Sequence, residues 1–172
     1  MDFKITHHFE ASPDEVADAL IDEDFQASLA DVASLSEREV ILQEERRDGS
    51  ILRRIRCVLD IDVSGAAKKF LGGAKPSWIE EARWDPGARR WTWTIHPEVA
   101  AELMSAGGHI DVGKQGSGAC RTVSGSVKVK VPLYGSKVEG WIVSGIEAAY
   151  DEEAERLAEW LERENRSARS PT

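Results

Sequence analysis

The sequence has no run of apolar residues approaching the ~20 that a transmembrane helix needs. We therefore predict that the chain does not cross a bilayer. Only two cysteines, Cys57 and Cys120, occur in 172 residues, which excludes a disulfide framework and favours two reduced, buried thiols. The first five residues lack the basic-then-apolar layout of a secretion signal. A cytoplasmic protein is the resulting expectation.

Positive charge is also scarce. The chain carries 22 Lys and Arg against 31 Asp and Glu, a formal net charge of −9. General nucleic-acid binding needs a concentrated basic surface, because the affinity comes from neutralising phosphates. Acidic neighbours dilute the short basic groups of this chain, so we predict no nucleic-acid partner.

Patterns that hold a metal or a cofactor are missing. A zinc site needs three or four converging ligands, yet His7 and His8 are adjacent, and adjacent residues of a strand face opposite ways. His96 and His109 have no Cys or carboxylate at ligand spacing beside them. The glycines at 113, 116 and 118 do not have the spacing of a phosphate-binding loop and instead predict a hairpin turn. We predict no metal and no cofactor.

What the chain does contain is enough for one domain. A chain of 172 residues buries roughly 70% of its unfolded surface, which suffices for one hydrophobic core. We expect this domain to cover residues 1–166 and the last residues, 167–172, to form a disordered tail.

The sequence pattern predicts a strand and then a helix at the start of this domain, and a long helix at its end. Residues 3–9 alternate with a period of two, as a half-buried strand does. Ser12, Pro13 and Glu15 then form a capping box that begins a helix, which we expect to split in two near residues 22–24. After Pro132, residues Ser136 and Glu139 predict a second capped helix, about 30 residues long, that ends near Arg166.

Between the helices, strand patterns dominate. We predict strands over residues 51–63, 77–84, 89–96 and 120–131, with turns at 48–49 and 85–88. Residues 106–118 are glycine-rich and are predicted to form a looser stretch. The fold class is therefore α+β, with a long final helix across an antiparallel sheet.

Two segments carry a family resemblance that covers nearly the whole chain, from Phe3 to about Arg166. The first is the opening of residues 3–9 (FKITHHF) followed by residues 12–16 (SPDEV), and the second is residues 131–139 (VPLYGSKVE). With the order of elements, they resemble the START-like superfamily, which includes polyketide cyclases and the birch-pollen allergen, and in particular an uncharacterised bacterial branch. The resemblance implies a helix-grip fold: a curved antiparallel sheet of about six or seven strands, two short helices after the first strand, and a long C-terminal helix packed across the sheet.

The resemblance also implies an apolar cavity between the sheet and the last helix, and hence binding of a small hydrophobic molecule, lipid-like or aromatic. The side chains expected to line it come from the first strand, the middle of the sheet and the last helix: Phe3, Ile5, His7, Phe9, Trp91, Trp93, Trp141, Gly145 and Ala149. Each of them also fits a plain core position. Two other functions stay open: a protein-interaction module with a collapsed cavity, and a cyclase- or aromatase-type enzyme.

The enzyme alternative depends on titratable groups inside the cavity. His7 shares the apolar face of its strand, where an imidazole can act as a general acid or base or simply be a satisfied core residue. Arg53 and Tyr134 are the other polar candidates. Arg53 lies at an apolar position, where it either meets a ligand or an acid, or extends its charge outward to solvent. The superfamily has no shared catalytic residues, so the resemblance assigns no role to them.

Overall fold

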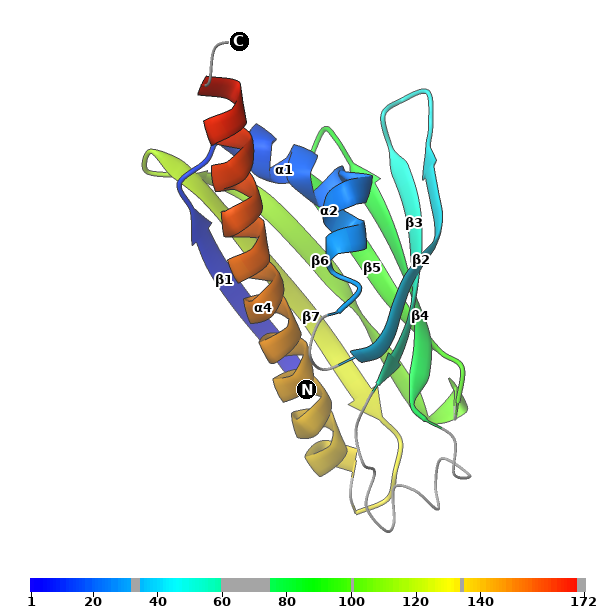
Figure 1. The fold of residues 1–172 in the computed structure, drawn as a ribbon. Coiled ribbons are helices and arrows are strands. Elements are labelled where there is room, and N and C mark those ends of the chain that lie inside the picture. Colours follow the sequence, from blue (N-terminus) through cyan, green and yellow to red (C-terminus); the bar gives the residue numbers. More distant parts are fainter. Residues whose placement is uncertain (32–34, 60–74, 100, 134, 170–172) are drawn as a thin grey trace.

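Seven antiparallel strands form one sheet in the order β1-β7-β6-β5-β4-β3-β2 (Figure 1). The computed structural model describes residues 1–31, 35–59, 75–99, 101–133 and 135–169. Each strand pairs with its neighbour in an antiparallel ladder, and β7 is the partner that brings β1 onto the edge beside the last hairpin. The strands are β1 (Asp2–Phe9), β2 (Leu35–Glu45), β3 (Ile51–Leu59), β4 (Ser77–Asp85), β5 (Arg90–Pro97), β6 (Met104–Gln115) and β7 (Gly118–Val129).

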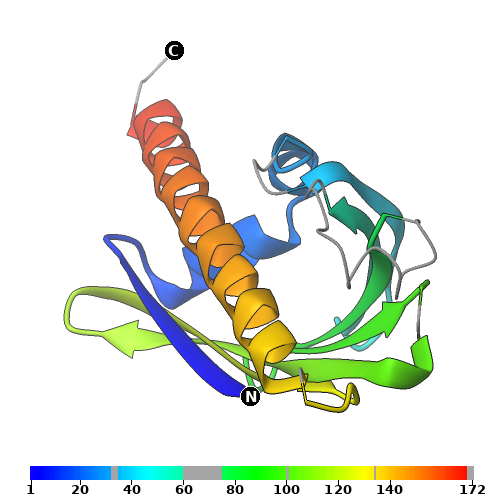
Figure 2. The same ribbon diagram turned by 90° about the horizontal axis from the view of Figure 1, so that it is seen from below.

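The helices lie on the inner side of the curved sheet. Helices α1 (Pro13–Ile21) and α2 (Glu23–Ser28) follow β1, and a short 3-10 helix, η1 (Ala101–Leu103), precedes β6. Helix α4 (Gly135–Arg169) is 35 residues long and crosses the sheet over β1 and β7 (Figure 2). The predicted helix-grip architecture is confirmed. Helix α4 continues through Arg169, so three residues of the predicted tail are helical.

Of the two capping boxes that the sequence predicts, the structure confirms the one that begins α1 and not the one that begins α4. The Ser12 hydroxyl accepts a hydrogen bond from Glu15 N (3.2 Å), and the Glu15 carboxylate accepts one from Ser12 N (2.7 Å), so the predicted capping box is confirmed. Glu139 does not close a second box with Ser136. Its carboxylate accepts from the backbone N of Val129 and from the amino group of Met1, both at 2.9 Å, and so attaches α4 to the sheet.

The glycine-rich stretch before residue 116 is a regular strand, not the loose segment that the sequence predicts. Strand β6 pairs with β7 along its whole length and with β5 over residues 106–111, and the turn that follows consists of Gly116, at φ +60°, and Ser117. The glycines that weaken a strand signal have a steric role here. A Cβ on Gly125 of β7 would lie 2.5 Å from the Trp93 ring, and one on Gly108 would lie 2.8 Å from it.

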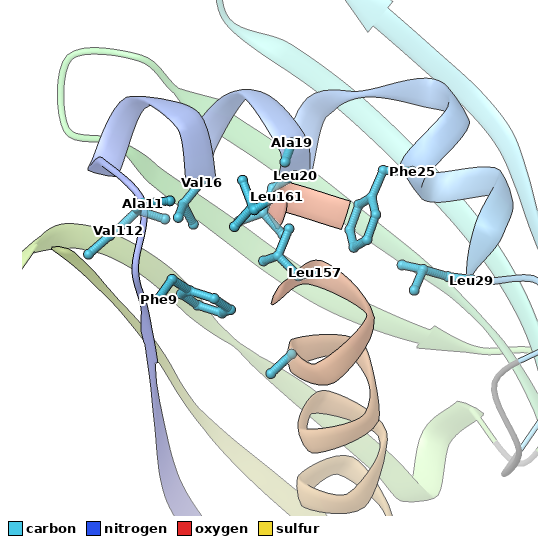
Figure 3. Packing of buried hydrophobic residues seen from close by; sticks show 12 residues of the cluster. Phe9, Ala11, Val16, Ala19, Leu20, Phe25, Leu29, Val112, Leu157 and Leu161 are labelled. Atoms are coloured by element: carbon cyan, nitrogen blue, oxygen red, sulfur yellow. The ribbon is translucent and has the colours of Figure 1, made fainter. Parts of the chain in front are cut away.

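Buried side chains form two clusters, one toward each end of α4. The first cluster joins α1, α2 and the C-terminal half of α4, with Val16, Phe25, Leu29 and Leu157 fully buried (Figure 3). The second lies over the middle strands around Trp84, Trp91 and Trp93, and it meets α4 through Val143. The first cluster anchors α1 and α2 to α4, and the second bears on the candidate site.

Candidate functional site

Strand register identifies the residues that face α4. Trp93 of β5 lies opposite Ala82 of β4, which in turn lies opposite Arg53 of β3, so these three share the inner face of the sheet. Toward the opposite edge of the sheet, His7 of β1 lies opposite Arg121 of β7, also on the inner face. Alternation along each strand then assigns every second residue to this inner face.

Among the described residues, several apolar side chains of the inner face are only partly buried. Apolar side chains there contact the second cluster yet keep part of their surface accessible. They come from β5, β6 and β7 on the sheet side and from the N-terminal half of α4 on the helix side. We call them the half-buried apolar group: Ile95, Met104, Val129, Ile142 and Ile146.

Three polar side chains accompany this group. Arg53 is 6% exposed, and its Nη1 donates to the carbonyl of Leu20 at the end of α1 (2.8 Å), while its guanidinium lies 4.2 Å from the centre of the Trp91 ring. Glu80 of β4 is on the same face, because it pairs with Ile55 and Ile95. Tyr150 of α4 interacts electrostatically with both Arg53 and Glu80. We call these three residues the polar cluster.

Burial shifts the pKa of all three groups in the polar cluster. Desolvation lowers the pKa of Arg53 to about 10, which leaves it charged at neutral pH. Desolvation also raises the pKa of Glu80 against the opposing charges of Arg53 and Arg38, and it raises the pKa of the Tyr150 phenol. Glu80 and Tyr150 nevertheless keep part of their surface accessible. This combination of a desolvated ionisable group and accessible surface is what side chains facing a recess, rather than a filled core, would show.

A second polar network fixes α4 to the edge of the sheet. Arg121 is fully buried, and it forms an ion pair with Glu153 and donates to the Tyr150 carbonyl (3.0 Å). His7 lies between Arg121 and Asp151, with its Nδ1 3.2 Å from Arg121 Nη2 and its Nε2 2.8 Å from Asp151 Oδ1. Because the guanidinium can only donate, Nδ1 accepts and the neutral imidazole donates from Nε2. His7 is thus a satisfied structural residue in this geometry.

The predicted cavity residues separate into several places. Phe3, Ile5, Trp91 and Trp93 belong to the second cluster, and Phe3 lies 6.2 Å from Trp93 between ring centres. Phe9 belongs to the first cluster, against which Ala149 also packs.

Two of the predicted residues lie elsewhere. Trp141 is 59% exposed, and a Cβ on Gly145 would meet no atom within 4 Å. The expectation that these two face the sheet is wrong. Both lie on the side of α4 opposite Val143, because the stripe that faces the sheet passes through Ile142, Val143 and Ile146.

Arg53 also corrects the sequence interpretation, because it is buried instead of extending outward to solvent. Tyr134 lies outside the described residues. The sequence did not predict three further residues of these two networks, Arg121, Glu80 and Tyr150. Strand parity was the available signal for two of them. Arg121 shares the inward parity of Ala119 and Val123, and Glu80 shares that of Ala82 and Trp84. Tyr150 follows Ile146 by one helical turn.

Other chemistry finds little support in the described part of the chain. Burial raises the pKa of the Cys57 thiol to about 12, so it is not a thiolate nucleophile at neutral pH. No group of three or more His, Cys, Asp or Glu among the described residues is arranged to hold a metal. Within the same residues, no helix is long and apolar enough to span a membrane.

Two surface hollows, of about 480 and 320 Å³, lie away from the polar cluster. Both are bordered by His8, Phe9 and Glu10 at the end of β1. The larger continues along the C-terminal part of α4, and the smaller along the turn between β6 and β7.

Solved structures share this architecture. The chain is similar to an aromatase/cyclase, ZhuI, from Streptomyces sp. R1128, with 14% identity, 99% of both chains covered and a TM-score of 0.65. It is also similar to a START superfamily protein from Mycobacterium smegmatis (15% identity, 94% of this chain and 97% of that one, TM-score 0.58) and to norcoclaurine synthase from Thalictrum flavum (16%, 94% and 87%, TM-score 0.62). At these identities the likeness concerns the fold.

The sheet order and the position of α4 therefore define a helix-grip fold, the fold that the START superfamily protein from Mycobacterium smegmatis shares. Within that class, residues 4–161 match the family described as a protein of unknown function, DUF2505, and the chain belongs to that family. No curated protein matches the chain.

Proposed function

We propose that this protein binds a small hydrophobic molecule between the inner face of its sheet and the N-terminal half of α4. The observation that carries the proposal is the half-buried apolar group, whose side chains pack on a buried cluster yet keep accessible surface. A small ligand covering them would remove apolar surface from water, worth roughly 25 cal/mol per Å². Other proteins with this fold support it, including one that is a START superfamily protein.

The first test is native mass spectrometry of the freshly purified protein, followed by extraction and identification of any co-purifying molecule. A discrete bound mass that is lost on denaturation is the expected result. A mass of the bare chain, together with no thermal stabilisation by fatty acids, sterols or aromatic polyketides, would contradict the proposal.

Two neighbouring residues of α4 locate the site. Ile146 packs against the second cluster, whereas Gly145 is exposed with no atom within 4 Å of an added Cβ. We expect Ile146→Trp to fill the recess and abolish ligand uptake, and Gly145→Trp to leave uptake unchanged. Equal loss of binding in both variants would show that α4 does not form the wall of the site.

A further inference from the structure

The polar cluster contains hydrogen-bonding groups that the fold itself does not use. Arg53 Nε is buried without an acceptor, although Nη1 of the same guanidinium is bonded to the end of α1. No described residue donates a hydrogen bond to the Glu80 carboxylate, and none accepts from the Tyr150 hydroxyl. The indole N–H groups of Trp91 and Trp93 are buried and unpaired as well.

A purely structural role explains only part of this arrangement. Capping of α1 and stacking on Trp91 explain why β3 carries an arginine at position 53. They do not explain why β4 places a carboxylate on the same face without an ion pair to that arginine. Burying Arg53 Nε without an acceptor costs free energy, and such groups in native structures are normally matched by water or a ligand. The Glu80 carboxylate and the Tyr150 hydroxyl keep accessible surface, so they are free to bind water or a ligand beside it.

The chemistry of the three groups restricts what can match them. Arg53 only donates, the Glu80 carboxylate accepts when it is ionised, and the Tyr150 hydroxyl does both. A carboxylate in the recess would meet the negative charge of Glu80, and an ammonium would meet the positive charge of Arg53. A hydroxyl or carbonyl oxygen avoids both conflicts, because it accepts from Arg53 or Tyr150, and a hydroxyl also donates to Glu80.

We propose that the ligand of this protein is an uncharged hydrophobic molecule whose buried end carries a hydroxyl or carbonyl oxygen, bound by Arg53, Glu80 and Tyr150. This inference rests on the proposed function and adds the class of ligand. The half-buried apolar group covers the body of the molecule, and the polar cluster forms hydrogen bonds with its oxygen. A hydrocarbon of the same shape lacks the oxygen and would leave these groups unmatched.

The experiment compares four matched probes by isothermal titration calorimetry at neutral pH: naphthalene, 1-naphthol, 1-naphthoate and 1-naphthylmethylamine, whose amine is protonated and which should, like naphthoate, bind more weakly than 1-naphthol. We expect 1-naphthol to bind about tenfold more tightly than naphthalene, as one hydrogen bond to a charged group provides, and naphthoate to bind more weakly than 1-naphthol. Equal affinity for naphthol and naphthalene, or tightest binding of naphthoate, would overturn this inference while the proposed function stands. Binding of none of the four would overturn both.

Substitutions in the polar cluster test whether its side chains cause the preference for naphthol over naphthalene. Tyr150→Phe and Glu80→Gln change side-chain groups that form no hydrogen bond with any described residue, so both variants should fold. Each should reduce the preference for naphthol over naphthalene to less than threefold. Arg53→Met should do the same but also loses the bond to Leu20, and circular dichroism therefore checks its fold. Arg54→Met is the matched control, because Arg54 lies on the outer face of the same strand and pairs with Glu81. An unchanged preference in both Tyr150→Phe and Glu80→Gln would contradict the assignment.

Discussion

At the residue scale, the buried charges of this protein do two different things. Arg121 has its ion pair with Glu153 and joins three elements, so its charge is compensated within the fold. Arg53 has one bond to a helix end and an unpaired Nε. Nε of Arg121 is unpaired as well. The two arginines therefore differ in that Arg121 has an ion pair within the fold, whereas Arg53 has none among the described residues and, under our proposal, meets a bound molecule instead.

His7 makes the structural network sensitive to pH. Burial, more than any other influence, lowers the pKa of His7 below its ordinary value of 6.5, with the Arg121 charge acting in the same direction and Asp151 opposing. The unfolded state therefore binds a proton more readily, and stability is fully present above pH 6.5 and falls as the pH drops from 6.5 toward the folded-state pKa. The charged groups that act on the imidazole are Arg121 from β7 and Asp151 and Glu153 from α4.

We expect the unfolding free energy to decrease between pH 7.5 and pH 5.5 by more in the native protein than in His7→Gln, at no more than about 1.4 kcal/mol per pH unit for one proton. Urea unfolding at both pH values measures the difference, and the carboxylates common to both proteins cancel in it. Identical pH dependence of the two proteins would show that His7 is not the group responsible.

At the element scale, the sequence predicted what depends on local chemistry and missed what depends on contacts between strands. The capping box at Ser12 and the strand parity of residues 3–9 are local, and both are confirmed. Strand β6 was missed because its glycines signal a loop, whereas Gly108 makes space for the Trp93 ring of the neighbouring strand. The orientation of Trp141 was missed because the rotation of α4 is set by packing against the sheet.

Substitution of two glycines tests this difference between local preference and contacts across the sheet. A Cβ on Gly125 would approach Trp93 to 2.5 Å and Phe3 to 2.9 Å, so Gly125→Ala should destabilise the protein by about 1–3 kcal/mol through overpacking. Gly145 lies in the exposed middle of α4, where Gly145→Ala should stabilise by about 0.5–1 kcal/mol through helix propensity. Chemical denaturation compares the two, and a neutral Gly125→Ala would show that Trp93 can move away from the sheet.

At the scale of the whole molecule, α4 serves the two ends of the interior differently. Its C-terminal half inserts Leu157 and Leu161 into the first cluster, where α1 and α2 close the core (Figure 3). Its N-terminal half presents Ile142, Ile146 and Tyr150, which are only partly buried, and Tyr150 interacts electrostatically with Arg53 and Glu80. Stability should therefore concentrate at one end and binding at the other.

This division predicts different effects for two truncations on the same helix, one mainly on stability and the other mainly on ligand preference. Leu157 is fully buried, so Leu157→Ala should cost about 2–5 kcal/mol of unfolding free energy without changing which ligands bind. Ile146→Ala should cost about 1 kcal/mol, because its side chain is already partly accessible, and it should widen the recess and improve binding of bulkier ligands relative to small ones. Urea denaturation and calorimetry on both variants test the prediction together. A large stability loss in Ile146→Ala with no change in ligand preference would mean that the N-terminal half of α4 closes a core, as its C-terminal half does, and that the inner face holds no ligand there.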